Sequence, residues 1–193
     1  MNVSIRYLFG LLLPLLLAAA AASAQEQATC REISFPRHLQ VSGSDLTLNG
    51  LGVRKATFLK VNVYVAALYV AQPSRDAKTI IESDKPQQLT LQFVRNVGVE
   101  DLRKAFVEGF ERDPSAALKE RVARLNGWMS DMKTGQRLIF VRLPHSGVQV
   151  SVNGVQKGLI EGDDFARALI SIWMGATPPN PELKSGLLGG ECS

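Results

Sequence analysis

The part of the sequence that decides the fold runs from Leu46 to Val70 and reads LTLNGLGVRKATFLKVNVYVAALYV. Its second half, from Val61 onward, is too rich in β-branched and aromatic residues for a preferred helix, so it predicts a strand. Gly50-Leu51-Gly52 indicates a break or bend in the first half. We therefore expect the longest extended part of the chain here, interrupted at the glycine pair.

Further strands are predicted on both sides of the middle of the chain. Residues 89–93 alternate apolar and polar side chains with the period of a half-buried strand, and residues 138–143 return to strand composition. Val148–Val152 and Val155–Leu159 flank Asn153-Gly154, a pair that suits a type I′ turn. These two segments predict a β-hairpin.

Three stretches have helical periodicity. Apolar residues recur every three or four positions in a first stretch, and again after Asp113-Pro114, a predicted N-cap followed by proline at the first helical position. A last helix is predicted to open at Asp163 or Asp164 and to end at Gly175. The periodic residues of the first two helices are Val99, Leu102, Phe106 and Phe110, then Leu118, Val122, Leu125 and Met129.

The order of elements indicates the fold class. Strands, two helices, three strands and a helix, without βαβ alternation, predict an α+β domain in which helices cover one face of an antiparallel sheet. No repeat and no linker rich in Pro, Gly or Ser divides residues 25–193, so we interpret them as one domain.

Residues 1–24 are predicted to be a secretory signal peptide. A short start ending at Arg6 precedes an apolar run, and Ala22-Ser23-Ala24 is a small-residue cleavage site, which places the cut between Ala24 and Gln25. The run is shorter than the ~20 residues that span a bilayer, and Pro14 interrupts it. We expect a periplasmic or secreted protein that has no membrane span after cleavage.

The charged residues and cysteines fit an exported domain. Removing Arg6 lowers the formal net charge from +4 to +3, and the cations are interspersed with acids, so we expect no nucleic-acid partner. Cys30 and Cys192 would meet an oxidising compartment, so we predict a disulfide between them. Two free thiols or an intermolecular bridge are the alternatives.

Several kinds of catalytic or cofactor site are excluded by residue content. The sequence has only two histidines, His38 and His145, and no Gly-x-Ser-x-Gly elbow, so a hydrolytic triad is disfavoured. Two distant cysteines and two distant histidines do not supply a zinc site. The Gly50-x-Gly52 pair lacks the third glycine and the helix of a phosphate-binding loop. We expect no metal and no cofactor.

One arginine lies among residues that otherwise predict a buried or half-buried strand. A buried guanidinium requires an ionic partner or an anionic ligand. Arg54 is therefore either an ordinary surface residue or a group that holds a ligand.

The order of several motifs resembles the chalcone isomerase-like family, in its bacterial exported branch. The resemblance extends from about Leu46 to Gly189. It rests on Gly50-Leu51-Gly52-Val53-Arg54, Val63-Tyr64-Val65-Ala66-Ala67-Leu68-Tyr69, Phe93-Val94-Arg95, Phe106 to Phe110, Gly154 to Gly162 with Phe165, Ile172-Trp173-Met174-Gly175 and Leu187-Leu188-Gly189.

The resemblance implies an open-faced β-sandwich, in which a large antiparallel sheet is covered by a layer of helices with a ligand cleft between them. In plant chalcone isomerases a strand arginine stabilises the enolate during flavanone ring closure, and non-catalytic relatives use it on a fatty-acid carboxylate. Arg54 corresponds to this arginine. The family's threonine, tyrosine and asparagine fall at Leu59, near Leu102 and near Gly109, which supply no such donors.

Three hypotheses follow. The leading one is a non-catalytic binding protein with a cleft lined by Leu59, Leu102 and Phe106 and with Arg54 on the acidic group of an apolar or fatty-acid-like ligand. The second is an isomerase, an intramolecular lyase of an α,β-unsaturated substrate, with Arg54 as its sole electrophilic stabiliser. The third is a structural protein that acts through a partner, with Arg54 in an internal salt bridge.

Overall fold

A computed structural model describes residues 26–56, 59–111 and 118–193. The predicted signal peptide and the predicted helix start at Asp113-Pro114 lie outside these residues. The described chain forms nine strands and five helices in the order β1 (Gln27–Cys30), β2 (Ile33–Pro36), β3 (His38–Val41), β4 (Ser44–Ala56), β5 (Val61–Val70), α1 (Ala77–Glu82), β6 (Gln87–Phe93), α2 (Val99–Phe110), α3 (Leu118–Trp128), β7 (Arg137–Leu143), β8 (Gly147–Val152), β9 (Val155–Glu161), α4 (Asp163–Met174) and α5 (Pro181–Leu187).

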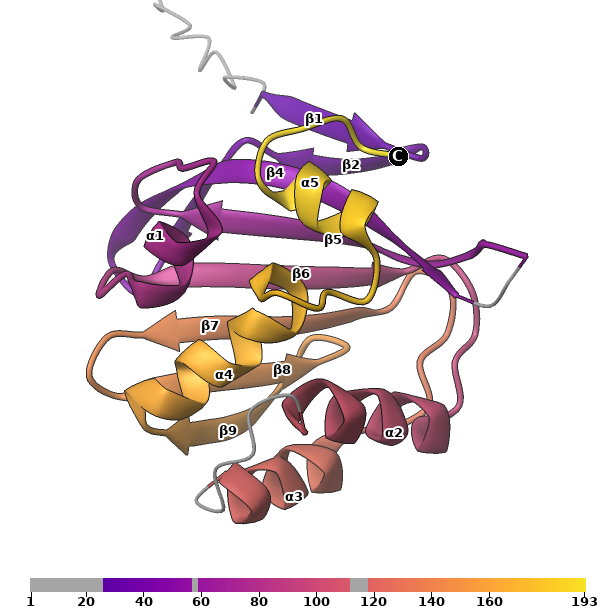
Figure 1. The fold of residues 1–193 in the computed structure, drawn as a ribbon, viewed down its shortest axis with the longest axis vertical. Helices are drawn as coiled ribbons and strands as arrows, with labels where there is room; N and C mark the ends of the chain where they lie inside the picture. Colours follow the sequence, from indigo (N-terminus) through magenta and orange to yellow (C-terminus); the bar gives the residue numbers. More distant parts are fainter. Residues whose placement is uncertain (1–25, 57–58, 112–117) are drawn as a thin grey trace, which may run out of the picture.

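Strands β3 to β9 form one antiparallel sheet in sequence order, and β1 and β2 form a separate hairpin. All five helices lie on one face of the large sheet (Figure 1). The predicted α+β architecture is therefore confirmed. The β8–β9 hairpin is also confirmed, with φ of 48° at Asn153 and 79° at Gly154, as a type I′ turn requires.

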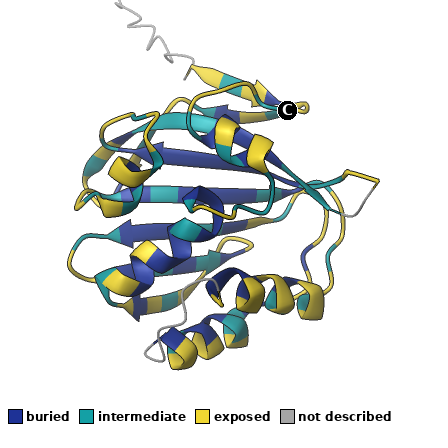
Figure 2. Cartoon of the chain, in the orientation of Figure 1, coloured by how far each residue is buried: buried dark blue, intermediate teal, exposed yellow. Residues whose placement is uncertain are grey.

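Strand β5 separates two apolar cores, because its side chains alternate between the faces of the sheet. Tyr64, Ala66 and Leu68 pack in the core beneath the helices, whereas Val65 and Ala67 pack in a second core with residues of β1 and β2. The strand is dark along most of its length in Figure 2 because both faces are covered. This explains its nearly continuous apolar sequence.

The expected break at the glycine pair is wrong. Strand β4 is continuous through Gly50 and Gly52, although its pairing with β5 shifts between Leu48 and Gly50. A Cβ atom at Gly50 would collide with the backbone oxygen of Gly186, and one at Gly52 with that of Leu183. The glycines therefore let α5 pack directly on the backbone of β4.

The short elements β1, β2, β3, α1 and α5 did not emerge from periodicity. Helix α1 has six residues and depends on its N-cap, Asp76, whose carboxylate accepts hydrogen bonds from the backbone N–H groups of Lys78 and Thr79. Helix α5 has seven residues and starts at Pro181. Elements this short contain too few turns for an apolar stripe to be recognised.

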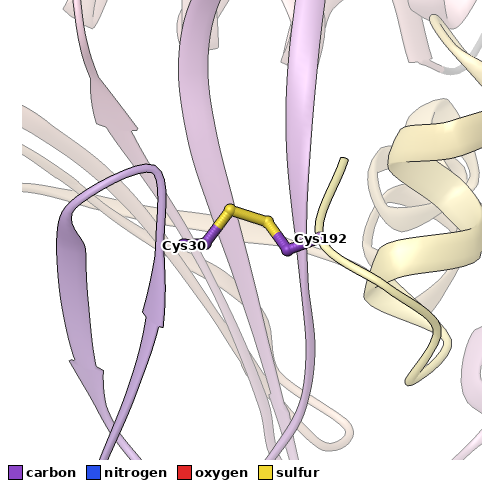
Figure 3. The surroundings of a disulfide bond; sticks show 2 residues. All are labelled: Cys30 and Cys192. Atoms are coloured by element: carbon purple, nitrogen blue, oxygen red, sulfur yellow. A yellow bond between two sulfur atoms is a disulfide. The ribbon is translucent and has the colours of Figure 1, made fainter.

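Cys30 and Cys192 form the predicted disulfide, with their Cα atoms 5.9 Å apart. The bond joins the end of β1 to the chain that follows α5 (Figure 3). It thereby connects the hairpin on one face of the sheet to the segment that carries α5 on the other.

Strand β9 forms one edge of the large sheet. Its pairing with β8 shifts next to Gly158, which has a φ of 154°. The Trp128 ring lies 3.0 Å from the position that a Cβ at Gly158 would take. This edge is therefore bulged, and α3 packs against it.

Candidate functional site

A cavity of about 560 Å³ lies between the sheet and the helix layer, bounded by β4, β5 and β6, by α2 and by the segment from α4 to α5. This volume is in the range of small-molecule sites. Its apolar lining is Ala56, Val63, Leu91, Phe93, Val97, Leu102, Ala105, Phe106, Ile172, Trp173, Pro178 and Pro179. Its polar and charged lining is Arg54, Tyr64, Arg95, Asn96, Asp101 and Glu108.

Arg54 is positioned by an irregularity in the pairing of β4 with β5. The pairing of β4 with β5 shifts between Arg54 and Lys55, and the Lys55 N–H instead donates to Asn180 Oδ1 at 2.9 Å. The same oxygen accepts a hydrogen bond from Arg54 Nη1 at 3.1 Å, and Nη1 also donates to the Lys55 carbonyl oxygen. Asn180, immediately before α5, therefore fixes both the bulge and the guanidinium.

No Asp or Glu forms an ion pair with Arg54 among the residues that the structure describes. Its described partners are uncharged oxygens of Lys55 and Asn180, and these occupy one of its nitrogens. Arg54 is half-buried and lines the cavity. A half-buried cation without a counter-ion favours an anionic group in the adjacent space.

Tyr64 lies directly opposite Arg54 in the β4–β5 pairing and lines the same cavity. Its hydroxyl oxygen accepts a hydrogen bond from Trp173 Nε1 at 2.9 Å, and its ring packs edge-on against Phe93. Burial raises the pKa of Tyr64 to about 12, so the phenol is neutral at ordinary pH. No acceptor for its hydroxyl hydrogen is found among the described residues, which leaves this donor for a bound group.

Three of the four residues predicted to line the cleft do so, namely Arg54, Leu102 and Phe106. Leu59 does not, since its side chain is 69% exposed in the turn between β4 and β5. Gly109, like Leu102, lies on the cavity wall formed by α2.

Helix α2 is held in place by polar contacts in its first half. The Val99 N–H at its start donates to Asp131 Oδ1 at 2.8 Å, and Arg103 Nε donates to the Asn126 carbonyl oxygen of α3 at 3.0 Å. These contacts keep the α2 wall at its place over the sheet and preserve the cavity beneath it.

Sequence reasoning missed three residues of the site: Tyr64, Trp173 and Asn180. Trp173 belongs to one of the family motifs, and its ring packs near Phe106 at 6.4 Å between centroids, but its N–H also orients Tyr64. Tyr64 belongs to a motif that was recognised, but its position opposite Arg54 depends on the length of the turn between them. Asn180 is 125 residues from Lys55 and has no local signal.

The site suits the binding of an apolar molecule that carries a negative charge or develops one. A guanidinium and a neutral phenol lie on neighbouring strands in the wall of a largely apolar cavity. Within residues 26–56, 59–111 and 118–193, no group of three or more His, Cys, Asp or Glu side chains is placed to hold a metal ion. No helix in that part of the chain is long and apolar enough to cross a bilayer.

Comparison with known proteins agrees with this architecture. A fatty-acid binding protein from Arabidopsis thaliana superposes with a TM-score of 0.70 at 17% sequence identity, covering 84% of this chain and 96% of the plant protein. No curated protein gives a significant sequence match. The family described as chalcone isomerase-like matches residues 27–189. With the sheet, the helix layer and the family motifs in agreement, the chain belongs to the chalcone isomerase-like family.

Proposed function

We propose that this protein binds a small apolar molecule with an acidic group, such as a fatty acid, without transforming it. The observation that carries the proposal is Arg54, a cation that lines the apolar cavity and has no described carboxylate partner. Arg54 would bind the acid, Tyr64 would donate its free hydroxyl hydrogen to it, and Leu102 and Phe106 would contact the chain of the ligand.

Two further observations support binding rather than catalysis. Leu102 and Gly109 occupy the α2 wall, where the family resemblance places a tyrosine and an asparagine, and neither side chain donates a hydrogen bond. The superposed plant protein is itself a fatty-acid binding protein. The third hypothesis, an internal salt bridge at Arg54 with no adjacent cavity, disagrees with the geometry of the site.

Titration with dodecanoate and with dodecanol tests the role of Arg54, because the two molecules share a chain and differ in charge. We expect Arg54→Ala to weaken dodecanoate binding by about 10- to 100-fold, the value of a charge-assisted hydrogen bond, and to leave dodecanol binding nearly unchanged. Arg124→Ala, an exposed arginine of α3, is the matched control. Equal losses for both molecules would show that Arg54 shapes the cavity rather than binding the acid.

Native mass spectrometry of the purified protein provides a second test. We expect co-purifying acidic lipids on the wild-type protein and fewer on Arg54→Ala. Identical spectra without any bound lipid for both proteins, together with no dodecanoate binding, would refute the proposal.

The pairing of Arg54 with Tyr64 favours one alternative, an intramolecular lyase acting on an α,β-unsaturated substrate. Two donors on one oxygen would stabilise a developing enolate, and each such donor is typically worth ~3 kcal/mol in a transition state. Loss of a chalcone above the buffer rate, reduced in both Arg54→Ala and Tyr64→Phe, would support this activity. A rate of chalcone loss equal to that in buffer would refute the lyase alternative.

We further propose that the protein acts outside the cytoplasm after cleavage between Ala24 and Gln25. The Cys30–Cys192 disulfide supports an oxidising compartment. The intact mass of the protein recovered from the periplasm, measured without reductant, should correspond to a chain that starts at Gln25 and has lost two hydrogens.

A further inference from the structure

The turn between β4 and β5 carries an apolar side chain into solvent. Leu59 is the most exposed of the large apolar side chains described, at 69%. It lies between Ala56 and Val61, the pair of residues at which β4 and β5 meet at this end of the sheet. The same two strands supply Arg54, Ala56, Val63 and Tyr64 to the cavity. The exposed Leu59 therefore lies at the end of β4 and β5 that also lines the cavity.

Cations flank this leucine. Lys60 follows it directly and is exposed, and Lys55 precedes the turn on β4. Neither lysine forms an ion pair with a described residue, and neither has an acidic neighbour in the sequence. An apolar side chain between lysines is the arrangement that enters a membrane surface, because lysine stems lie along lipid while their ammonium groups stay at the headgroups.

A second recess lies behind the same two strands. It measures about 490 Å³, and Val53, Val65 and Val94 contribute to its apolar floor. Val53 and Val65 face away from the helices, so this recess and the ligand cavity lie on opposite faces of the sheet. Arg31 and Arg95 line the recess, and Arg95 lines the ligand cavity as well.

Both arginines are exposed, and no ion pair is described for either of them. Glu32 follows Arg31 in its turn, whereas Arg95 has only uncharged sequence neighbours. A guanidinium binds phosphate through two parallel hydrogen bonds, and an apolar floor beside it accommodates the glycerol and upper acyl part of a lipid. The recess thus adds phosphate-binding groups to the same end of the molecule.

We propose that this end of the protein docks on a membrane of anionic phospholipid. Leu59 enters the lipid, Lys55 and Lys60 lie at the headgroups, and Arg31 and Arg95 bind lipid phosphates. Docking in this orientation turns the strands that line the cavity toward the bilayer. Given the proposed function, a sparingly soluble acyl ligand would pass between membrane and cavity without crossing water.

Co-sedimentation with vesicles tests the docking. The exported protein, with its N-terminus read by mass spectrometry, is mixed with vesicles of phosphatidylcholine alone or with about one third phosphatidylglycerol. We expect binding to the anionic vesicles that decreases with added salt, and little binding to phosphatidylcholine. No binding to anionic vesicles, or retention on a soluble polyanion without vesicle binding, would overturn the proposal.

Variants of the turn locate the contact. Lys60→Gln should weaken binding to anionic vesicles ~5-fold, and Leu59→Asp at least ~10-fold, because it removes an apolar anchor and adds a repelled charge. Val155→Asp and Lys157→Gln make the same changes on the β8–β9 hairpin, where Val155 is 57% exposed and Lys157 is exposed. Equal effects of the turn variants and the control variants would overturn the assigned surface. A retained apolar leader would give this result, because it would bind all variants to vesicles equally.

The two proposals can fail separately. Dodecanoate binding from solution should be unchanged in Leu59→Asp and Lys60→Gln, whose circular dichroism and thermal unfolding verify the fold. Solution binding without vesicle binding would refute docking and leave the proposed function standing. Vesicle binding without dodecanoate binding would refute the proposed function and leave docking standing.

Discussion

Two arginines face the helix layer from opposite ends of the same sheet, and their surroundings differ. Arg142 on β7 is 5% exposed beneath α4, and the free space beside it is about 20 Å³. Arg54 on β4 borders a cavity of about 560 Å³. The difference lies in whether a helix closes over the guanidinium, so the same residue type is structural at one end and available to a ligand at the other.

The closed end is completed by short-range contacts. Arg142 Nη1 donates to the Ile81 carbonyl oxygen of α1 at 3.0 Å, and its cross-strand neighbour Gln87 donates to the Ile80 carbonyl oxygen at 2.6 Å. Both bonds satisfy carbonyl groups near the end of α1 that the short helix leaves without partners. Burial lowers the pKa of Arg142.

The open end is held differently. Helix α5 is fixed by close packing on Gly50 and Gly52, by the Asn180 hydrogen bonds and by the nearby disulfide, while α2 stands over the cavity. Side-chain hydrogen bonds to α1 complete the closed end, whereas backbone contact and a covalent bond position the elements around Arg54. Four changes test this contrast.

Removing the disulfide should have the largest effect. The bond closes a loop with a sequence separation of 162 residues, so replacing Cys30 and Cys192 by Ser is expected to lower the free energy of unfolding by ~4 to 5 kcal/mol through chain entropy. Urea denaturation of the oxidised protein measures this loss. A loss below ~1 kcal/mol would mean that packing alone holds the C-terminal segment in place.

Truncating the two arginines should separate stability from binding. Arg142→Ala leaves the Ile81 carbonyl oxygen of α1 without its donor and creates a hole under α4, and we expect a loss of ~2 to 4 kcal/mol in the free energy of unfolding. Arg54→Ala should cost less than ~1 kcal/mol, because its space is already open to solvent or ligand. Similar losses for both variants would contradict the distinction between the two ends.

Supplying Arg54 with a carboxylate should block an acidic ligand. Asn180→Asp keeps the acceptor for Lys55 N–H and Arg54 Nη1 and adds a negative charge beside the guanidinium. We expect dodecanoate affinity to fall ~10-fold while dodecanol affinity and thermal stability change little. Unchanged dodecanoate affinity would indicate that Arg54 is not the acid-binding group.

A pH experiment on the Arg121–Asp164 pair should show the smallest effect. Arg121 lies on α3, and its hydrogen bonds to Asp164, at the start of α4, lower the pKa of that carboxyl to about 2. This pair therefore stabilises the fold above pH ~4 and loses its contribution as pH falls toward 2. Because Asp164 is 54% exposed, we expect Asp164→Asn to be only slightly less stable at neutral pH, with the difference vanishing near pH 2 in urea titrations.

Most of the sheet and the three longer helices could be predicted from sequence, because each repeats its period several times. Leu102 and Phe106 belong to a stripe on α2 that had to face the sheet, and both line the cavity. Arg54 was identifiable because it interrupts an apolar strand. Local periodicity, reinforced by burial, was sufficient at these positions.

The remaining parts depend on contacts between distant residues. The glycine pair indicated a bend, but its role is to receive α5, which lies more than a hundred positions along the chain. Leu59 looked like a lining residue because the length of the β4–β5 turn was not known. Tyr64 belongs to the site because the register of β4 and β5 places it opposite Arg54. Asn180 belongs to it because the register shift at Lys55 leaves an N–H without a partner in the sheet, and Asn180 accepts this hydrogen bond.

The bulged edge strand β9 has a consequence for behaviour at high concentration. An open strand edge invites pairing with the edge of another molecule, and the exposed Val155 would favour such pairing. The bulge at Gly158 interrupts the regular spacing of hydrogen-bonding groups, and Lys157 adds a charge next to it. The strand therefore protects the protein against intermolecular sheet growth at high concentration, and deleting Gly158, which would restore regular pairing, should make the protein precipitate on storage.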